Sequence, residues 1–196
     1  CRKAGGKIRL KGKELKIRIP TDAVRQGLAL VPEERRKEGA LVSETVHFNL
    51  AAASLDKYCD LSFVNQRKMA KNANFYVENL GIRTPSIRQR VANLSGGNQQ
   101  KVVVGKWLAA DSDVYIFDEP TKGVDVGAKQ DIFRLIGDIA KRGHGVIYAS
   151  CENNELLSLT DRIYVMFDGR IQAELKTSET NEDEIMYYAV GGMNKT

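Results

Sequence analysis

Residues 114–120 read VYIFDEP, an apolar run that ends in two acids and a proline. An apolar run of this length, rich in aromatic and β-branched residues, is typical of a buried β-strand. Asp118 and Glu119 follow it, and parallel sheets bind ligands at the carboxyl ends of their strands. There, one carboxylate can hold a magnesium ion on nucleotide phosphates while the other reaches an attacking water. Taken alone, the pattern is more often an ordinary turn, so the surrounding sequence has to decide.

The sequence on both sides of this strand alternates between strand and helix patterns. Short apolar runs at 27–31, 146–149 and 163–167 predict three more buried strands. Apolar residues recur at helical spacing over 132–140, and Gly143 follows where a helix would end. This alternation predicts an α/β fold with a parallel sheet.

Charged residues dominate the first part of the chain. Alternating residues at 7–10 and 15–19, separated by a turn at 11–13, predict a β-hairpin. Its charges fit a solvated outer face as well as they fit a binding patch. The run at 33–39 predicts a charged loop.

The region from 46 to 94 has a helical pattern instead. Apolar residues recur every three or four positions over 69–80, which predicts an amphipathic helix. Gly81 stands where a C-terminal cap is expected, so the helix should end there.

A glycine pair precedes the acidic strand by one helix, within residues 94–101, which read LSGGNQQK. Gly96 and Gly97 have no Cβ and let backbone N–H groups approach an anion, and a following helix adds the positive end of its dipole. The hydroxyl of Ser95 can donate to the same phosphate. By itself the pattern fits a turn and helix cap equally well. Its order relative to the acidic strand and to Asp125 is far more specific.

The composition excludes several classes of protein. The chain has 196 residues, 42% hydrophobic and 28% charged, which is ordinary for a globular protein and unlike disordered or fibrous ones. It holds neither a signal-peptide pattern nor a run of about 18 apolar residues, so a cytoplasmic protein is expected. Cys1, Cys59 and Cys151 lack metal-site spacing and predict no disulfide framework. The first residue is Cys1 rather than Met, which suggests a piece of a longer protein.

The basic surplus does not indicate a nucleic-acid partner. The net charge is +5, and residues 1–43 hold 12 basic and 5 acidic side chains. The same residues contain no Phe, Tyr or Trp on which bases could stack. We therefore expect no nucleic acid among the partners.

Taken together, the motifs resemble those of ATP-binding-cassette (ABC) ATPases. Residues 94–101 are similar to the signature motif in the form typical of simple-sugar importers, and 114–119 to the Walker B strand. Residues 121–125 resemble the D-loop and 27–39 the Q-loop region. The likeness covers residues 5–192 and is strongest to the second, C-terminal cassette of a ribose-, galactose- or xylose-type importer.

The resemblance implies a fold and a division of the chain. The fold would be an α/β, P-loop NTPase-like (RecA-like) ATPase core with an antiparallel β-hairpin region and an α-helical subdomain, truncated at the N-terminus. The regions would be a β-subdomain with the Q-loop (1–43), the helical subdomain (44–93), the core with signature, Walker B, D-loop and switch (94–176), and a C-terminal helix and tail (177–196).

It also implies roles for single residues, with ATP and Mg²⁺ as cofactors. Asp118 would lie near the magnesium ion, and Glu119 would be the catalytic residue that orients the hydrolytic water. Asp125 would lie at the interface between two cassettes. The γ-phosphate of ATP held by the opposite cassette would be bound by Ser95, Gly96, Gly97 and Asn98.

The implied partners follow from the architecture of such importers. They are a second ATPase cassette (in the same full-length chain or in a homodimer), membrane permease subunits and, indirectly, a periplasmic sugar-binding protein. The protein would lie peripherally at the cytoplasmic face of the inner membrane.

Three departures from the family pattern weaken the chain's own nucleotide site. No G-x-x-x-x-G-K-[ST] loop occurs, and the family places this Walker A loop upstream of where this chain begins. Cys151 stands at the switch-loop histidine position and is a poorer hydrogen-bond donor. Glu33 stands at the Q-loop glutamine position, where a carboxylate would repel phosphate unless magnesium screened it.

These departures leave two hypotheses open. In the first, the chain contributes its signature motif in trans to the ATP site of the partner cassette of a sugar-import ATPase. In the second, it is a non-catalytic dimerisation and coupling cassette with a degenerate nucleotide site. Nucleotide binding with and without magnesium discriminates between them.

Overall fold

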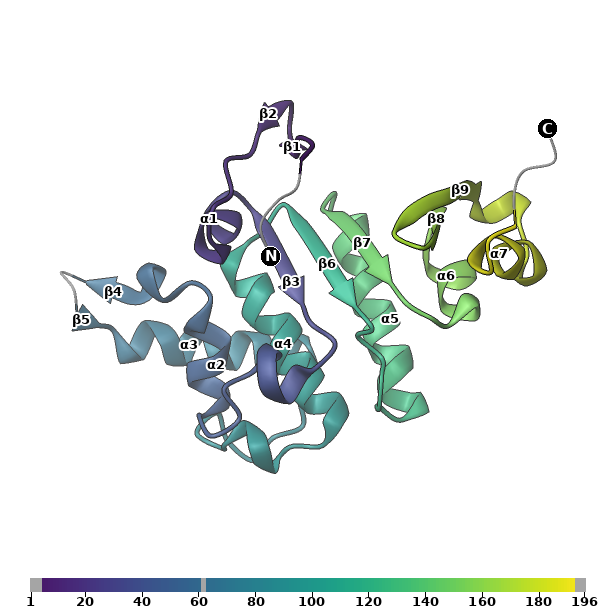
Figure 1. Ribbon diagram of the computed structural model, residues 1–196. Helices are drawn as coiled ribbons and strands as arrows, with labels where there is room; N and C mark the ends of the chain where they lie inside the picture. Colours follow the sequence, from purple (N-terminus) through teal and green to yellow (C-terminus); the bar gives the residue numbers. More distant parts are fainter. Residues whose placement is uncertain (1–4, 61–62, 193–196) are drawn as a thin grey trace. The chain divides into compact units, whose positions relative to one another are not determined.

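The strand that ends in the two acids, β6 (Val114–Asp118), lies in the middle of a three-stranded sheet. The computed structural model describes residues 5–60 and 63–192 (Figure 1). The sheet has the order β3–β6–β7, with β3 at Leu28–Val31 and β7 at Gly145–Ala149. β3 and β6 run parallel, as predicted.

One face of this sheet is buried and the other is not. Alternate residues of β3 and β6 are at most 1% exposed: Ala29, Val31, Tyr115 and Phe117. Helix α4 (Gly96–Ala110) packs on β3 and on α5 (Val126–Lys141). On the other face Leu30 is 49% exposed, and on β7 Ile147 is 55% exposed. The prediction that 146–149 is a buried strand is therefore wrong, because no residue of β7 is buried. β7 lies at the edge of the sheet and has β6 as its only paired neighbour among the described residues.

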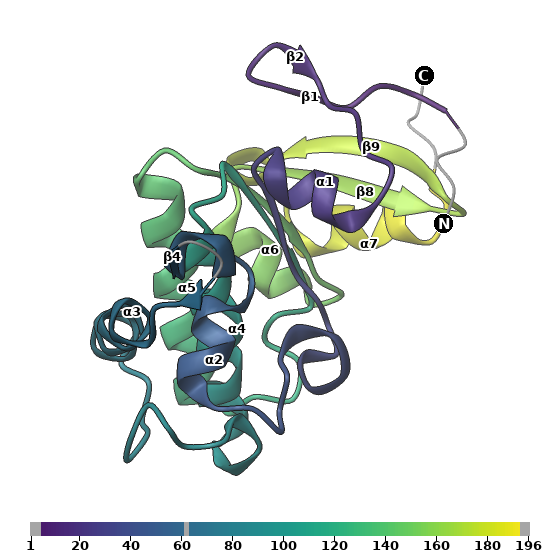
Figure 2. The same ribbon diagram turned by 90° about the vertical axis from the view of Figure 1, so that its left-hand side faces the viewer.

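The helical region packs against α4. Helices α2 (Val46–Ala52) and α3 (Gln66–Asn79) contact each other and α4, and Figure 2 looks along α3 with α2 and α4 beside each other. The predicted helix over 69–80 is confirmed, and Gly81 ends it with a φ of +56°. Their shared core consists of Val46, Leu50, Ala73, Ile82, Val91, Leu94 and Val102. The remaining elements here are η2 (Leu55–Tyr58), β4 (Cys59–Asp60), β5 (Phe63–Val64) and η3 (Val91–Asn93).

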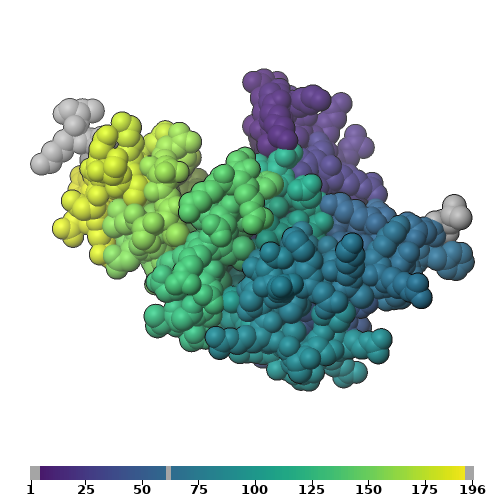
Figure 3. Space-filling model, turned by 180° about the vertical axis from the view of Figure 1, so that it is seen from behind, coloured from purple at the N-terminus to yellow at the C-terminus, as the bar shows by residue number. Residues whose placement is uncertain are grey.

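The N-terminal hairpin forms, but not with the predicted strands. β1 (Arg9–Leu10) pairs antiparallel with β2 (Lys13–Glu14), and the hairpin projects from its surroundings in Figure 3. Lys11 and Gly12 have φ values of 50° and 78°, so the turn has only two residues and the pairing begins at Lys13. Residues 15–19 therefore form no strand and lead into α1 (Pro20–Arg25).

By packing, the chain forms two compact units, Cys1–Ile147 and Tyr148–Thr196. In the second unit, β8 (Arg162–Phe167) pairs antiparallel with β9 (Arg170–Lys176). The prediction that 163–167 belongs to the parallel sheet is therefore wrong. The unit also contains α6 (Asn153–Leu159), η4 (Thr177–Glu179) and α7 (Glu182–Ala189), and its core consists of Ile163, Val165, Ala173, Ile185 and Tyr188.

Candidate functional site

The glycine pair forms the first turn of α4 rather than a turn ahead of it. Ser95 is the N-cap residue, and the helix begins at Gly96. Although serine commonly caps helices with its hydroxyl, the Ser95 side chain makes no such bond and is exposed. The N–H groups of this first turn therefore receive no cap from Ser95, which is the arrangement that binds anions at a helix N-terminus.

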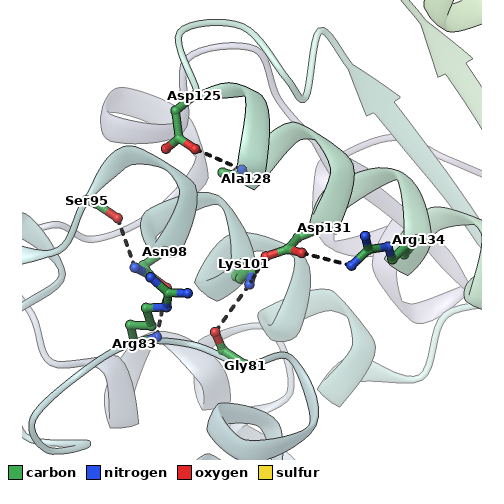
Figure 4. A network of polar contacts seen from close by, with 9 residues as sticks. All are labelled: Gly81, Arg83, Ser95, Asn98, Lys101, Asp125, Ala128, Asp131 and Arg134. Atoms are coloured by element: carbon green, nitrogen blue, oxygen red, sulfur yellow. Dashed lines mark hydrogen bonds and ion pairs between the residues drawn. The ribbon is translucent and has the colours of Figure 1, made fainter.

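The Ser95 hydroxyl is oriented by Asn98 (Figure 4). The backbone N–H of Arg83 donates to Asn98 Oδ1 at 2.8 Å, and Asn98 Nδ2 donates to Ser95 Oγ at 2.9 Å. Because a backbone N–H can only donate, the first bond fixes which end of the amide is oxygen. The Ser95 oxygen therefore acts as acceptor toward Asn98, and its single proton is not used in that bond.

Gly97 lets the N-termini of α4 and α5 approach each other. A Cβ on Gly97 would lie 2.4 Å from the Cβ of Ala128. Asp125 is the N-cap of α5, and its Oδ1 accepts a hydrogen bond from the N–H of Ala128 at 2.9 Å. Asp125 therefore fixes the start of α5 directly beside the first turn of α4, which contains the glycine pair and is called the signature turn below.

Lys101, which the sequence did not single out, ties α4 to two neighbours. It is 9% exposed, and its Nζ donates to the carbonyl oxygen of Gly81 at 3.2 Å and to Asp131 Oδ2 at 2.8 Å (Figure 4). The hydrogen bond from Lys101 holds the pKa of the Asp131 carboxyl below its usual value. These contacts join α4, called the signature helix below, to the end of α3 and to α5.

The two acids occupy the end of β6, as predicted. Asp118 is exposed and shares a strand face with Val114 and Ile116, opposite the buried residues. Glu119 has a φ of 44°, a left-handed conformation that costs about 1 kcal/mol for a residue with a Cβ. The N–H of Lys122 donates to the Glu119 carbonyl oxygen at 3.1 Å and closes a turn after the strand.

Glu33 and its neighbours contact that same turn. The Glu33 carboxylate forms an ion pair with Lys122, which offsets the negative charge that the sequence placed there. Residues Arg35–Gly39 form a π-helical turn, η1, so the prediction of a loop at 33–39 is wrong for most of that segment. The carbonyl oxygen of Arg35 accepts from the N–H of Ala40 at 2.8 Å, which is the spacing of a π-turn.

Cys151 belongs to the second compact unit, whereas the other predicted site residues lie in the first. It is exposed and follows β7. The loop around it is held by Glu155, which is 2% exposed and accepts hydrogen bonds from the hydroxyls of Tyr148 and Ser150.

The acids suit a magnesium ion that is shared with a nucleotide. Among the described residues, no group of three or more His, Cys, Asp or Glu side chains could hold a metal ion alone. Magnesium on nucleotide phosphates needs only one or two carboxylates, because phosphate oxygens and water complete its coordination. The exposed carboxylate of Asp118 meets that requirement.

Lys106 is predicted to titrate near pH 8. Burial lowers the pKa of this side chain, on α4, to about 8. Its Nζ donates to the carbonyl oxygen of Gly39 at 2.5 Å and lies 4.9 Å from the ring centroid of Trp107. Because Trp107 is the sole tryptophan of the chain, its fluorescence should change with a midpoint near pH 8, and the change should vanish in Lys106→Met.

The same shift predicts how stability depends on pH. Since the folded pKa lies below the unfolded value, the unfolded chain binds more protons between pH 8 and 10.5. The free energy of unfolding should therefore gain roughly 3 kcal/mol from this group as the pH rises through that window. Chemical denaturation of wild type and Lys106→Met at both ends of the window measures how much the free energy of unfolding changes with pH in each protein. An equal change in the two proteins would contradict the prediction.

None of the described helices is long and apolar enough to cross a membrane.

The chain is similar in sequence to a known protein family and to several known proteins. The family model described as ABC transporter matches residues 1–122. The chain is 45% identical over 187 residues to the xylose import ATP-binding protein XylG of Thermoanaerobacter pseudethanolicus, covering 95% of this chain and 37% of that protein. It is 46% identical over 185 residues to the galactose/methyl galactoside import ATP-binding protein MglA of Clostridium tetani, covering 94% and 37%. The chain thus spans little more than a third of the length of these relatives.

Solved structures confirm the predicted fold. A nucleotide-free ATP-binding cassette from an ABC transporter matches with a TM-score of 0.75 at 20% identity, covering 95% of this chain and 74% of that one. A dimeric ATP-binding cassette in a post-hydrolysis state bound to ADP and Pi matches with a TM-score of 0.74 at 18% identity, covering 89% and 74%. The fold is that of an ABC ATPase cassette, and the chain belongs to the ABC transporter family.

Proposed function

We propose that this chain is part of the ATP-binding subunit that energises sugar import by an ABC transporter. In that subunit it presents Ser95 and the first turn of α4 to ATP held by a second cassette. The observation that carries this proposal is the Asn98–Ser95 hydrogen bond, at 2.9 Å, beside a helix N-terminus that Ser95 does not cap. The names of the relatives, which are xylose and galactose import ATP-binding proteins, support the sugar importer.

The chemistry assigned to each residue follows from its position. The Ser95 proton and the N–H groups of Gly96 and Gly97 stabilise the negative charge of a phosphate. Asn98 acts through Ser95, so it is a positioning residue rather than a direct phosphate ligand. Asp118 would hold Mg²⁺, which shields the phosphate charge when bound, and Glu119 accepts a hydrogen bond from the water that attacks the phosphorus.

The partners are part of the same proposal. The likeness to a dimeric cassette supports a second cassette as the partner. Asp125 would lie at the contact between the two. Membrane permease subunits would receive the mechanical work, and a periplasmic sugar-binding protein would deliver the substrate. The subunit would then lie peripherally at the cytoplasmic face of the inner membrane.

Substitution of Ser95 tests the role in trans. In the full-length protein, Ser95→Ala should lower the kcat for ATP hydrolysis about a hundredfold, because one donor to developing phosphate charge is lost. Asn98→Ala should lower it by a smaller factor, since the hydroxyl remains but is no longer oriented. Ser86→Ala, which removes another exposed serine hydroxyl, is the matched control and should leave kcat unchanged. Equal kcat in wild type and Ser95→Ala would contradict the proposal.

A second function, a non-catalytic coupling cassette, is favoured by one observation. Glu33, at the Q-loop position, is engaged with Lys122. Calorimetric titration of the chain with ATP, with and without Mg²⁺, tests whether its own nucleotide site is retained. Magnesium-dependent binding would favour retained chemistry at Asp118 and Glu119 and contradict a degenerate site. The Ser95→Ala result then decides between the role in trans and the coupling cassette.

A further inference from the structure

We infer that Arg35 is a positioning residue that holds the turn after the two acids against the signature helix. The inference rests on the proposed function, because the turn joins residues to which ATP hydrolysis is assigned. It starts from η1, the π-helical turn that follows β3. The side chain of Arg35 contacts the turn at Lys122–Gly123 and the first turn of α4.

The guanidinium of Arg35 donates hydrogen bonds to two successive carbonyl groups. Its Nη1 donates to the carbonyl oxygen of Lys122 at 2.9 Å, and its Nη2 donates to that of Gly123 at 3.2 Å. A planar fork with two parallel N–H groups fixes the direction of the chain it holds, which a single ammonium group cannot do. Gly123 has a φ of +67°, so the turn depends on a left-handed residue at the position whose carbonyl Arg35 binds.

A second contact from the same segment holds the same residue. The carboxylate of Glu33 forms an ion pair with the Nζ of Lys122, while Arg35 binds the Lys122 carbonyl. The side chain and the backbone of Lys122 are thus both held by residues two positions apart. These contacts span 87 to 89 residues of sequence, so they join separate parts of the fold and are not local turn contacts.

The signature turn lies directly against this guanidinium. A Cβ on Gly96 would lie 2.8 Å from Arg35 Nη2 and 3.5 Å from the carbonyl oxygen of Gly123. Gly96 therefore leaves the space into which Arg35 extends, besides exposing its own N–H. The Nε of Arg35 is buried, without a partner among the described residues, which places the base of the guanidinium inside this junction.

The consequence concerns the residues on either side of the turn. The turn begins at Glu119, whose carbonyl accepts from Lys122, and it ends at Asp125, which caps α5. By fixing Lys122 and Gly123, Arg35 sets where Glu119 lies relative to the signature turn. A displacement of about 1 Å of a catalytic group can cost up to a hundredfold in rate, so this clamp should affect turnover without touching the nucleotide.

Arg35→Ala, with Arg36→Ala as its control, tests the inference in the full-length protein that contains this chain. Arg36 is exposed and lies on the same π-turn, so the control removes an equal charge from the same element. In Arg35→Ala, hydrogen exchange of peptides that cover residues 119–125 should be about tenfold faster than in wild type. The kcat for ATP hydrolysis should fall about tenfold while KM for ATP stays within about twofold. Arg36→Ala should match wild type in both measurements.

Arg35→Lys keeps the charge and most of the stem but can replace only one of the two hydrogen bonds. It should give intermediate exchange and intermediate kcat, and it decides the question if Arg35→Ala does not fold. Exchange at 119–125 as slow as in wild type, in Arg35→Ala or in a folded Arg35→Lys, overturns the inference. If the wild-type protein hydrolyses no ATP, the proposed function fails, and the exchange measurement alone still decides the role of Arg35.

Discussion

Replacing Gly97 by alanine should destabilise the chain by roughly 2 to 3 kcal/mol, which is the cost of overpacking a tight contact. The added Cβ would lie 2.4 Å from the Cβ of Ala128, far inside van der Waals distance. Neither atom belongs to a flexible side chain, so α4 and α5 have to move apart. The movement would also separate the signature turn from Asp125, whose side chain accepts from the N–H of Ala128. Denaturant unfolding measures the loss of stability.

Gly137→Ala is the matched control for this prediction. Gly137 lies in the interior of α5, and a Cβ there would meet nothing within 4 Å. Alanine should therefore stabilise the chain by about 0.5 to 1 kcal/mol through its higher helix propensity. The same chemical change thus has opposite signs in two neighbouring helices. A loss at both positions, or a neutral Gly97→Ala, would show that the closeness of α4 and α5 is not what requires glycine at residue 97.

The local patterns of the sequence predict most elements of the first unit. The parallel pair β3–β6 and the helix over 69–80 follow from apolar periodicity, which is a local property of the chain. The error at β8 has a local cause too. Asp168 and Gly169 have φ values of 46° and 71°, and an Asp-Gly pair between two apolar runs is a strong hairpin signal that outweighs a parallel assignment.

The candidate site is predictable only where its residues are neighbours in sequence. Ser95 and Asn98 are three residues apart, and their motif contains both partners of the hydrogen bond. Asp125 was predicted as an interface residue, and its role as the N-cap of α5 also has a sequence signal, since Asp is favoured before a helix.

Arg35 and Lys101 escape such prediction. Arg35 binds a carbonyl 87 residues away, and Lys101 pairs with Asp131, 30 residues away. A charged residue whose partner lies that far along the chain has the same local pattern as a solvated one. Only the tertiary structure brings the partners together, so both would be taken for surface charges from the sequence.

Glu119→Gln should lower the kcat for ATP hydrolysis by the full-length protein at least a hundredfold, which is the usual size of a lost general base. Glutamine is almost isosteric with glutamate but cannot accept a proton, so water activation is removed while the shape of the site is kept. Other roles of the residue should survive: binding of ATP with Mg²⁺ should be unchanged, because Asp118 and the phosphates hold the ion. Steady-state kinetics gives kcat, and equilibrium titration gives the affinity.

The backbone at Glu119 makes this test sharper than it would be at an ordinary strand end. A φ of 44° is retained by this protein at a cost of about 1 kcal/mol for a glutamate, where glycine would fit without strain. Residues with a strained backbone cluster at active sites, so a glutamate in this conformation is expected to have a functional role. Glu38→Gln, which neutralises another exposed glutamate, is the control and should leave kcat unchanged. If Glu119→Gln hydrolyses ATP as fast as this control, the carboxylate at the end of β6 is not the base, and the coupling cassette becomes the better account of the chain.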